Sequence, residues 1–322
     1  MSTFKLNSGY EIPAIGLGTW AQHSFKPYEV EKAVEHALRY GYRHIDAAAC
    51  YQNEKEVGNG WKKSGVPREE IFITSKLWNT HHHPDHVEEA LNQTLKDLQT
   101  DYLDLYLIHW PIAFEHSNET LTPIDPVTKR VRIADVPVAD TWAALEKFVT
   151  VGKIRSIGIS NFTIDATKKL LETAKIVPAT NQIEAHPFLQ QPELTKFLQE
   201  TNILITAYSP LGNNAFGITR PSVIDDLSVV EIAKKLKKDP AQLLISWAIQ
   251  RGSAVLPKSV TPSRIESNLK NFIIPDLEFE ALNQLDRNAR YNYPFHWGVD
   301  VFRELGAEEA ERQAEEYAAS QR

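Results

Sequence analysis

A repeated unit runs along this chain and limits the folds open to it: a short apolar run, a turn, and then an amphipathic helix pattern. Strands that alternate with helices are typical of parallel sheets, because each helix returns the chain to the same end of the sheet. The apolar runs are Ala14–Leu17, Tyr42–Ile45, Ile71–Thr74, Leu103–Ile108, Ile154–Ile159, Ala179–Ile183, Ile203–Ala207 and Ala254–Leu256. The helix patterns are Tyr28–Arg39, Asn53–Lys63, Pro84–Leu98, Asp140–Val151, Ile164–Thr173, Gln191–Gln199 and Ala241–Gln250. Eight strands close a barrel, so the sequence predicts an α/β fold of the (β/α)8 TIM-barrel class.

Two connections are longer than the others. Ile112–Pro137 follows the fourth predicted strand and Leu211–Asp226 follows the seventh. Long loops after strands lie at the C-terminal face of such a barrel, where active sites form. No linker or change of composition divides the chain, so we expect residues 1–322 to form one barrel domain. The last stretch, Arg303–Arg322, is dense in Glu, Ala, Arg and Gln and is expected to be a charged helix or a frayed tail.

Composition excludes several classes of partner. A formal net charge of -7 argues against a nucleic-acid surface, and a single cysteine, Cys50, excludes an intramolecular disulfide and a cysteine-based zinc site. The sequence has neither a secretory signal nor an apolar run long enough to cross a bilayer. We therefore expect a cytoplasmic protein with no nucleic-acid or membrane partner, either a monomer or a weak homodimer.

Polar residues stand at or just after most of the predicted strands. The carboxyl ends of parallel barrel strands meet at one face, so these side chains are expected to converge there. A polar residue at one strand end is unremarkable, whereas the same pattern at nearly every strand indicates a site. The residues are Asp46, Lys76, His109, Ser160, Asn161, Gln182, Glu184, Tyr208 and Lys258.

Four residues suit proton transfer to a carbonyl oxygen: Asp46, Tyr51, Lys76 and His109. A tyrosine ordinarily has a pKa near 10, about three units too high for efficient proton transfer near neutral pH. A neighbouring ammonium from Lys76 would lower the pKa of Tyr51, and Asp46 would hold Lys76 in place. His109 would hydrogen-bond the carbonyl and orient it.

Ordered motifs throughout the chain match one family. The matching segments are GLGTW at Gly16–Trp20, RHIDAAACYQNEKEVG at Arg43–Gly58, SKLW at Ser75–Trp78, LKDLQTDYLDLYLIHWP at Leu95–Pro111, GKIRSIGISNF at Gly152–Phe162, NQIEAHPFLQQPEL at Asn181–Leu194, TAYSPLG at Thr206–Gly212 and LPKSVTPSRIESN at Leu256–Asn268. Over nearly its whole length the chain resembles the aldo-keto reductases. The resemblance is closest to the fungal aldose-type enzymes, which include xylose and glyceraldehyde reductases.

The resemblance implies roles for individual residues. Tyr51 matches the general acid, Lys76 and Asp46 match its partners, and His109 matches the orienting group. Tyr208 matches the aromatic residue that stacks on the nicotinamide ring. The remaining matches to cofactor contacts are Ser160, Asn161 and Gln182 at the carboxamide, and Thr19, Trp20, Ser209, Leu211, Ser259 and Asn268 elsewhere. The cofactor supplies the hydride in this family, so the protein supplies position and the proton.

The segment after the last predicted strand bears on the choice of cofactor. Lys258, Ser259 and Arg264 are placed to hydrogen-bond a 2′-phosphate, which favours NADPH. Val260 stands where some related enzymes that accept NADH have Asn, and Ser267 replaces a Glu that is common beside the adenine. The sequence predicts NADPH as the cofactor.

Aromatic residues at strand ends indicate how the substrate is selected. Trp20, Trp78 and Trp110 lie where the core does not need them and are expected to line the site together with His109, and Asn292 matches a residue that contacts sugar hydroxyls. We expect an NADPH-dependent reductase of small aldehydes and aldoses, such as glyceraldehyde, pentoses or uronates. Two alternatives stay open: a non-catalytic NADPH-binding barrel, and a ketone, steroid or quinone reductase of the same fold.

Two further patterns are set aside. Gly16–Ala21 partly fits a dinucleotide-binding fingerprint, but Gln22–Pro27 is expected to be a turn rather than the start of a helix. The histidines at 81–83 with His86 are expected in a solvated loop, because adjacent histidines cannot all face one ion. We predict no metal site, and Cys50 is expected to be a small buried residue.

Overall fold

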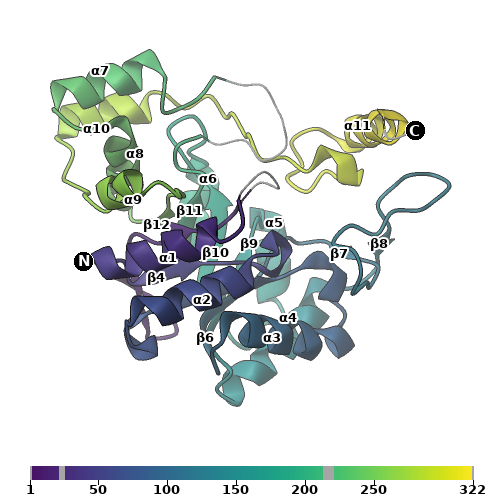
Figure 1. Ribbon diagram of the computed structural model, residues 1–322. Coiled ribbons are helices and arrows are strands. Elements are labelled where there is room, and N and C mark those ends of the chain that lie inside the picture. Colours follow the sequence, from purple (N-terminus) through teal and green to yellow (C-terminus); the bar gives the residue numbers. More distant parts are fainter. Residues whose placement is uncertain (1, 22–25, 213–220, 321–322) are drawn as a thin grey trace.

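The computed structural model describes residues 2–21, 26–212 and 221–320 (Figure 1). Most of the predicted turn Gln22–Pro27 and the centre of the predicted loop Leu211–Asp226 lie outside the described residues. Eight strands form one sheet in the order β12-β11-β10-β9-β6-β5-β4-β3, and all of its pairs are parallel. Parallel bridges from Ile15 to Val255 and from Gly18 to Lys258 join its two edges. The predicted (β/α)8 barrel is confirmed.

The barrel strands begin and end close to the predicted runs. They are β3 (Leu17–Gly18), β4 (His44–Asp46), β5 (Phe72–Leu77), β6 (Leu103–Ile108), β9 (Ile154–Ser160), β10 (Thr180–Glu184), β11 (Leu204–Tyr208) and β12 (Ala254–Leu256). The first is the least regular, because only two residues there are in strand conformation and the closing contacts are isolated bridges. Two short antiparallel pairs lie outside the barrel: β1 (Thr3–Lys5) with β2 (Glu11–Pro13), and β7 (Ala113–Phe114) with β8 (Ile133–Ala134).

The helices include several that the sequence pattern did not indicate. The predicted ones are α1 (Glu29–Tyr40), α2 (Glu54–Ser64), α3 (Pro84–Leu98), α4 (Val138–Thr150), α5 (Ile164–Leu171), α6 (Pro192–Glu200) and α8 (Pro240–Gln250). The additional ones are α7 (Leu227–Lys235), α9 (Pro262–Asn268) and α10 (Asp276–Asn283), with α11 (Ala307–Ser320) inside the predicted tail. Short 3-10 turns are η1 (Ala49–Tyr51), η2 (Arg68–Glu70), η3 (Asn79–His81) and η4 (Phe295–Trp297).

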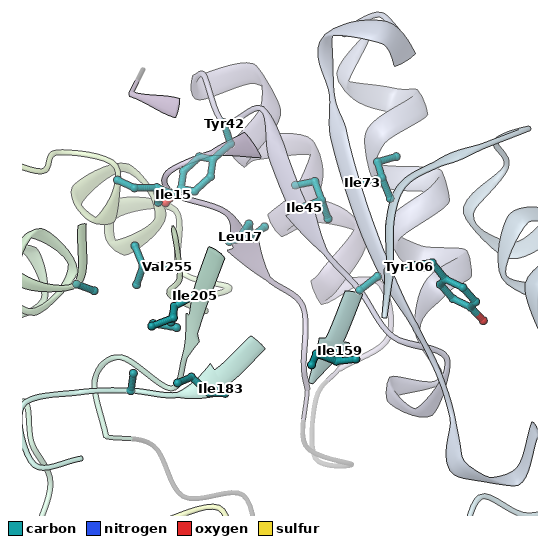
Figure 2. Close-up of a cluster of buried hydrophobic side chains, with 14 of the residues drawn as sticks. Ile15, Leu17, Tyr42, Ile45, Ile73, Tyr106, Ile159, Ile183, Ile205 and Val255 are labelled. Carbon is teal, nitrogen blue, oxygen red and sulfur yellow. The ribbon is translucent and has the colours of Figure 1, made fainter. Parts of the chain in front are cut away.

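Alternation along the strands decides which side chains enter the barrel. On β5 and β6, Phe72, Leu105 and Leu107 belong to an interior cluster, whereas Ile73 and Tyr106 belong to the large cluster between strands and helices (Figure 2). Successive residues of a strand point to opposite faces, so Lys76, four residues after Phe72, also faces inward. The same alternation sends Ser75 outward to the helices.

The N-terminal hairpin covers the amino end of the barrel. Leu6 and Ile12 are buried in the same cluster as the inward residues Phe72 and Leu105, which lie near the start of their strands. This packing closes one end of the barrel with apolar side chains. Among the described residues, the cavity lies at the opposite, carboxyl end.

The C-terminal helix packs onto the segment before it. In α11 the residues Ala310, Ala314 and Ala318 are buried, and their spacing of four places them on one side of the helix. The Tyr317 ring lies 5.0 Å from that of His296 in η4. At its other side Glu311 accepts two hydrogen bonds, of 2.7 and 2.6 Å, from the Arg130 guanidinium. Figure 1 shows α11 apart from the helices α7 to α10.

Candidate active site

A cavity of about 490 Å³ opens at the carboxyl end of the barrel. Most of the residues predicted to touch cofactor or substrate line it. These are Thr19, Trp20, Asp46, Tyr51, Trp78, His109, Trp110, Ser160, Asn161, Gln182, Tyr208, Ser209, Leu211, Lys258 and Asn292. Ser259, Val260, Arg264 and Asn268 are not among its lining residues, and Lys76 lies directly behind its wall.

Lys76 is the centre of the site. Its side chain is fully buried, and Nζ donates to Asp46 Oδ1 at 2.5 Å, to the Ala47 carbonyl at 2.9 Å and to the Tyr51 hydroxyl at 3.4 Å. A buried ammonium is tolerated only when it is paired and hydrogen-bonded, and these contacts meet that need. Because Nζ donates to the phenol oxygen, the Tyr51 proton is free to point into the cavity.

The acidity of Tyr51 differs from the expectation. Burial raises the pKa of Tyr51 well above its usual range, and the negative charge of Asp46 raises it further. The predicted net lowering of the Tyr51 pKa is therefore wrong for this structure. The physical reason is that desolvation of the buried phenol has the largest effect on its pKa, and the Asp46 carboxylate beside Lys76 acts in the same direction. The phenol keeps its proton at neutral pH.

His109 is held as a neutral imidazole. Burial, followed by the charge of Lys76, lowers its pKa well below the usual range. Its Nδ1 lies 3.4 Å from Sγ of Cys50, which is half-buried rather than buried as predicted. Burial raises the pKa of the Cys50 thiol, so the sulfur keeps its proton and can donate to Nδ1. This contact favours the tautomer with the proton on Nε2, which makes Nε2 the ring donor available to a carbonyl oxygen.

The residues that match nicotinamide contacts are hydrogen-bonded to these catalytic candidates. Gln182 Nε2 donates to Asp46 Oδ2 at 2.8 Å, and Ser160 Oγ donates to the Gln182 carbonyl at 2.9 Å. Asn161 Nδ2 donates to the His109 carbonyl at 3.0 Å, and Asn161 Oδ1 accepts from the Tyr208 hydroxyl at 2.7 Å. One hydrogen-bond network thus holds Asp46, Gln182 and Asn161 in place at the carboxyl end of the barrel, together with the Tyr208 ring.

Asn161 has a backbone conformation that most side chains avoid. Its φ is 64°, in the left-handed region that asparagine tolerates better than other non-glycine residues. That turn immediately follows β9 and directs the amide into the cavity. Local strain of this kind is held in place by the hydrogen bonds around it.

The residues present fit a nicotinamide dinucleotide. The cavity offers an aromatic face in Tyr208, amide groups in Asn161 and Gln182, and a cation in Lys258 at its edge. Burial lowers the pKa of Lys258, the behaviour expected of an ammonium withdrawn from water. Arg264 is exposed on α9, and its side chain has no ion pair within the described ranges. Both cations suit the phosphate groups of such a cofactor.

Aromatic rings form the wall opposite the catalytic candidates. The Trp297 ring lies 5.1 Å from that of Trp110, 5.0 Å from that of Phe114 and 6.2 Å from that of Trp78, all in edge-to-face contact. Trp78 Nε1 also donates to the Leu121 carbonyl at 2.7 Å, which fixes the loop after β7 to the cavity. These edge-to-face contacts make the wall largely apolar.

Sequence reasoning noted Glu184 as a strand-end residue but missed its role. Its buried carboxylate accepts hydrogen bonds from the backbone of Tyr291 at 2.9 Å and of Asn292 at 2.8 Å, and pairs with His186 at 2.9 Å. Burial alone would raise the pKa of Glu184, but the His186 contact and the nearby charge of Arg290 leave it below the usual value. Glu184 thereby fixes Asn292 at the cavity, and only the folded path of the C-terminal segment shows this.

The patterns that were set aside have clear places in the structure. The first helix after Gly16–Ala21 among the described residues is α1, which begins at Glu29, and most of the turn between them lies outside the described residues. The histidine run is only partly solvated: His82 is buried, and burial lowers its pKa to about 3. The expected solvated loop is therefore wrong for His82. No helix of the described part of the chain is long and apolar enough to cross a membrane.

A closed (β/α)8 barrel whose open end holds a buried Lys–Asp pair, a protonated tyrosine and a neutral histidine has the chemistry of an oxidoreductase that acts on carbonyl groups. Comparison with known proteins places the chain within that class. The sequence model of the Aldo/keto reductase family matches residues 14–288, and the chain belongs to this family, whose members use a nicotinamide cofactor.

Curated relatives match over most of their length. The chain is 45% identical over 303 residues to aldo-keto reductase family 1 member A1-A of Danio rerio, covering 91% of this chain and 92% of the relative. It is 45% identical over 317 residues to the NADPH-dependent D-xylose reductase of Meyerozyma guilliermondii, covering 92% and 98%. An aldehyde reductase of Saccharomyces cerevisiae is 44% identical over 294 residues, covering 89% and 91%.

A solved structure agrees with the fold. The aldose reductase of Schistosoma japonicum superposes with a TM-score of 0.83 at 42% sequence identity, covering 90% of this chain and 94% of that one. The likeness to fungal aldehyde and xylose reductases that the motifs indicated is thus confirmed by sequence, and the barrel is confirmed by structure.

Proposed function

We propose that this protein reduces small aldehydes and aldoses, such as glyceraldehyde, pentoses and uronates, to alcohols with NADPH, and that Tyr51 donates the proton. The observation that carries the proposal is the position of Lys76 Nζ, between Asp46 Oδ1 at 2.5 Å and the Tyr51 hydroxyl at 3.4 Å. Relatives named as aldehyde and xylose reductases support the substrate class. We further propose that it works in the cytoplasm as a monomer or a weak homodimer.

The residues divide the work of the reaction. A nicotinamide cofactor supplies the hydride to the carbonyl carbon when bound. Tyr51 gives its proton to the carbonyl oxygen, and Lys76 stabilises the negative charge that then develops on the phenol oxygen. Asp46 holds Lys76 in line, and His109 Nε2 hydrogen-bonds the oxygen and aims it at Tyr51.

A preference for hydroxylated substrates follows from the mixture of groups around the cavity. Trp20, Trp78 and Trp110 give shape and exclude water, and Asn292 offers an amide to sugar hydroxyls. The Asn292 side chain donates to Ser209 Oγ at 3.3 Å, so its amide is oriented before any substrate arrives. Small sugars with a polar chain suit such a wall better than large apolar ketones do.

Replacing Tyr51 with phenylalanine tests the mechanism. The change removes the proton and leaves the ring, so we expect kcat for glyceraldehyde to fall by about 10²- to 10⁴-fold while NADPH binding is kept. NADPH oxidation followed by absorbance measures the first quantity, and quenching of tryptophan fluorescence measures the second. Tyr102→Phe, outside the cavity, is the matched control. Near-normal turnover by Tyr51→Phe would refute the assignment, and a wild-type protein that reduces no aldehyde would favour a non-catalytic cofactor-binding barrel.

Replacing Arg264 with alanine tests the cofactor preference. If Arg264 contacts the 2′-phosphate, its loss should raise KM for NADPH at least ~10-fold, given about 1.5–3 kcal/mol per charge-assisted hydrogen bond. KM for NADH should stay the same, since NADH lacks that phosphate. Lys270→Ala removes an exposed cation just after α9 and serves as the control. An equal rise of KM for both cofactors would contradict a 2′-phosphate role.

A further inference from the structure

A second group of side chains with ligand chemistry lies away from the active-site cavity. His81 belongs to η3, Glu89 to α3, and His116 to the loop after β7. Their ligand atoms all lie within 4.8 Å of one another. None of the three lines the cavity, and they come from three segments that only the fold brings together.

Hydrogen bonds around the two imidazoles show which ring nitrogens an ion could take. His116 Nδ1 lies 3.1 Å from the Thr80 carbonyl, which can only accept, so Nδ1 carries the proton and Nε2 keeps its lone pair. Both ring nitrogens of His81 have partners, Nδ1 with Thr80 Oγ1 at 2.9 Å and Nε2 with Asn118 Oδ1 at 2.9 Å, so a bound ion would replace one of these two contacts. A histidine binds a metal only in its neutral form.

An asparagine bridges two of the three groups. His81 Nε2 lies 2.9 Å from Asn118 Oδ1, and Asn118 Nδ2 donates to Glu89 Oε1 at 3.1 Å. The Asn118 amide thus links the His81 imidazole to the Glu89 carboxylate, two groups that would bind the same ion if the amide moved away. Asn118 is an exposed loop residue, so its side chain can swing away.

His86 supports the group without joining it. Its ring is stacked on that of His116 with centroids 3.5 Å apart and planes 6° from parallel. Ring nitrogens coordinate in the plane of the ring, so two stacked imidazoles cannot both bind the same ion. The stacking instead fixes the orientation of His116.

We propose that His81, Glu89 and His116 form a binding site for a divalent transition metal ion, with Zn²⁺ as the expected occupant. Two imidazoles and one carboxylate are a ligand set that Zn²⁺ takes readily, with water in the fourth position. Mg²⁺ and Ca²⁺ prefer oxygen ligands alone and are not expected to bind. Tetrahedral zinc needs ligand atoms roughly 3.4 Å apart, a closure that the exposed Glu89 and His116 allow.

A bound ion would affect the active site indirectly, through the loop that carries His116. His116 lies five residues before Leu121, whose carbonyl accepts from Trp78 and whose side chain lines the cavity with Thr122. An ion shared by η3, α3 and this loop would hold the cavity wall against the barrel. The prediction of no metal site rests on His81–His83 and His86, which are close in the sequence, whereas His116 is 35 residues from His81 in the chain.

Zinc titration of the full-length protein tests the proposal. Isothermal calorimetry with ZnCl₂ should give one site in the wild type, and zinc should raise the melting temperature, since a ligand of the folded state stabilises it. His116→Ala and Glu89→Gln should each weaken the binding at least ~10-fold and remove most of the thermal shift. His83→Ala is the matched control, because His83 is a half-exposed neighbour outside the ligand group, and its binding should equal that of the wild type.

Three results would overturn the proposal. The first is a wild type that binds no zinc, and the second is a His116→Ala variant that binds zinc as tightly as the wild type. The third is displacement of zinc by excess Mg²⁺, which would indicate a carboxylate site instead. Circular dichroism of each variant without metal verifies that the fold is retained.

Discussion

Single residues set the chemistry through burial as much as through identity. The Lys76–Asp46 pair is fully enclosed, and such a pair contributes little net stability because desolvation opposes its attraction. Its use is electrostatic: it places a positive group beside a phenol that burial keeps protonated. A proton donor needs that protonated state, so the raised pKa suits reduction better than a lowered one would.

Glu54 is a second buried acid, and its ionisation makes the free energy of unfolding depend on pH. It accepts hydrogen bonds from Ser75 Oγ at 2.5 Å and Thr94 Oγ1 at 3.1 Å, between β5 and the helices α2 and α3. Burial raises its pKa from 4.5 to about 7. The folded protein therefore holds a proton that the unfolded chain releases between these two values, so the free energy of unfolding falls as pH rises through this window.

We expect Glu54→Gln to remove this pH dependence. The difference in unfolding free energy, variant minus wild type, should become more positive by up to about 3 kcal/mol between pH 4.5 and pH 8. Urea unfolding at several pH values measures it, and any fixed cost of the amide cancels in the comparison. Glu69→Gln, at an exposed position in η2, should show a difference that does not change with pH. A flat difference for Glu54→Gln would mean that the carboxyl is ionised throughout.

At the scale of elements, the barrel supplies the reaction and the added segments shape its surroundings. The strands carry Asp46, Lys76 and Gln182, whereas the aromatic wall comes from η4, from β7 and from the residues just after β5 and β6. Helix α11 supports η4 through small residues: Ala314 faces Gly298, where a side chain would meet both Ala314 Cβ and the Arg130 guanidinium. Close packing of this kind cannot accept a larger residue without displacement.

Undocking α11 should change substrate recognition more than chemistry. We expect Ala314→Glu to raise KM for aldehydes several-fold, because η4 loses its support, with NADPH affinity within about twofold of the wild type. Ala319→Glu adds the same charge on the exposed side of the helix and should have no effect. Steady-state kinetics and fluorescence titration separate the two quantities. A change in cofactor affinity as large as the change in KM would show that α11 supports the whole barrel instead.

At the scale of the molecule, the sequence predicted the barrel, and most of the site residues that it indicated line one cavity. That succeeded because strand alternation and strand ends are local features. Helix α9 was not marked because seven residues are too few for a periodic pattern. The pKa of Tyr51 and the meeting of His81 with His116 depend on burial and on the path of a long loop, and neither is a local property.

The segment after residue 288, which lines the outer part of the cavity, can evolve separately from the catalytic residues. The family match ends at residue 288, yet Asn292, His296 and Trp297 line the cavity from beyond that point. Mutations there leave the proton donor and its partners untouched. A duplicated gene could therefore change its substrate specificity through mutations in the segment after residue 288, while the reaction itself is inherited unchanged.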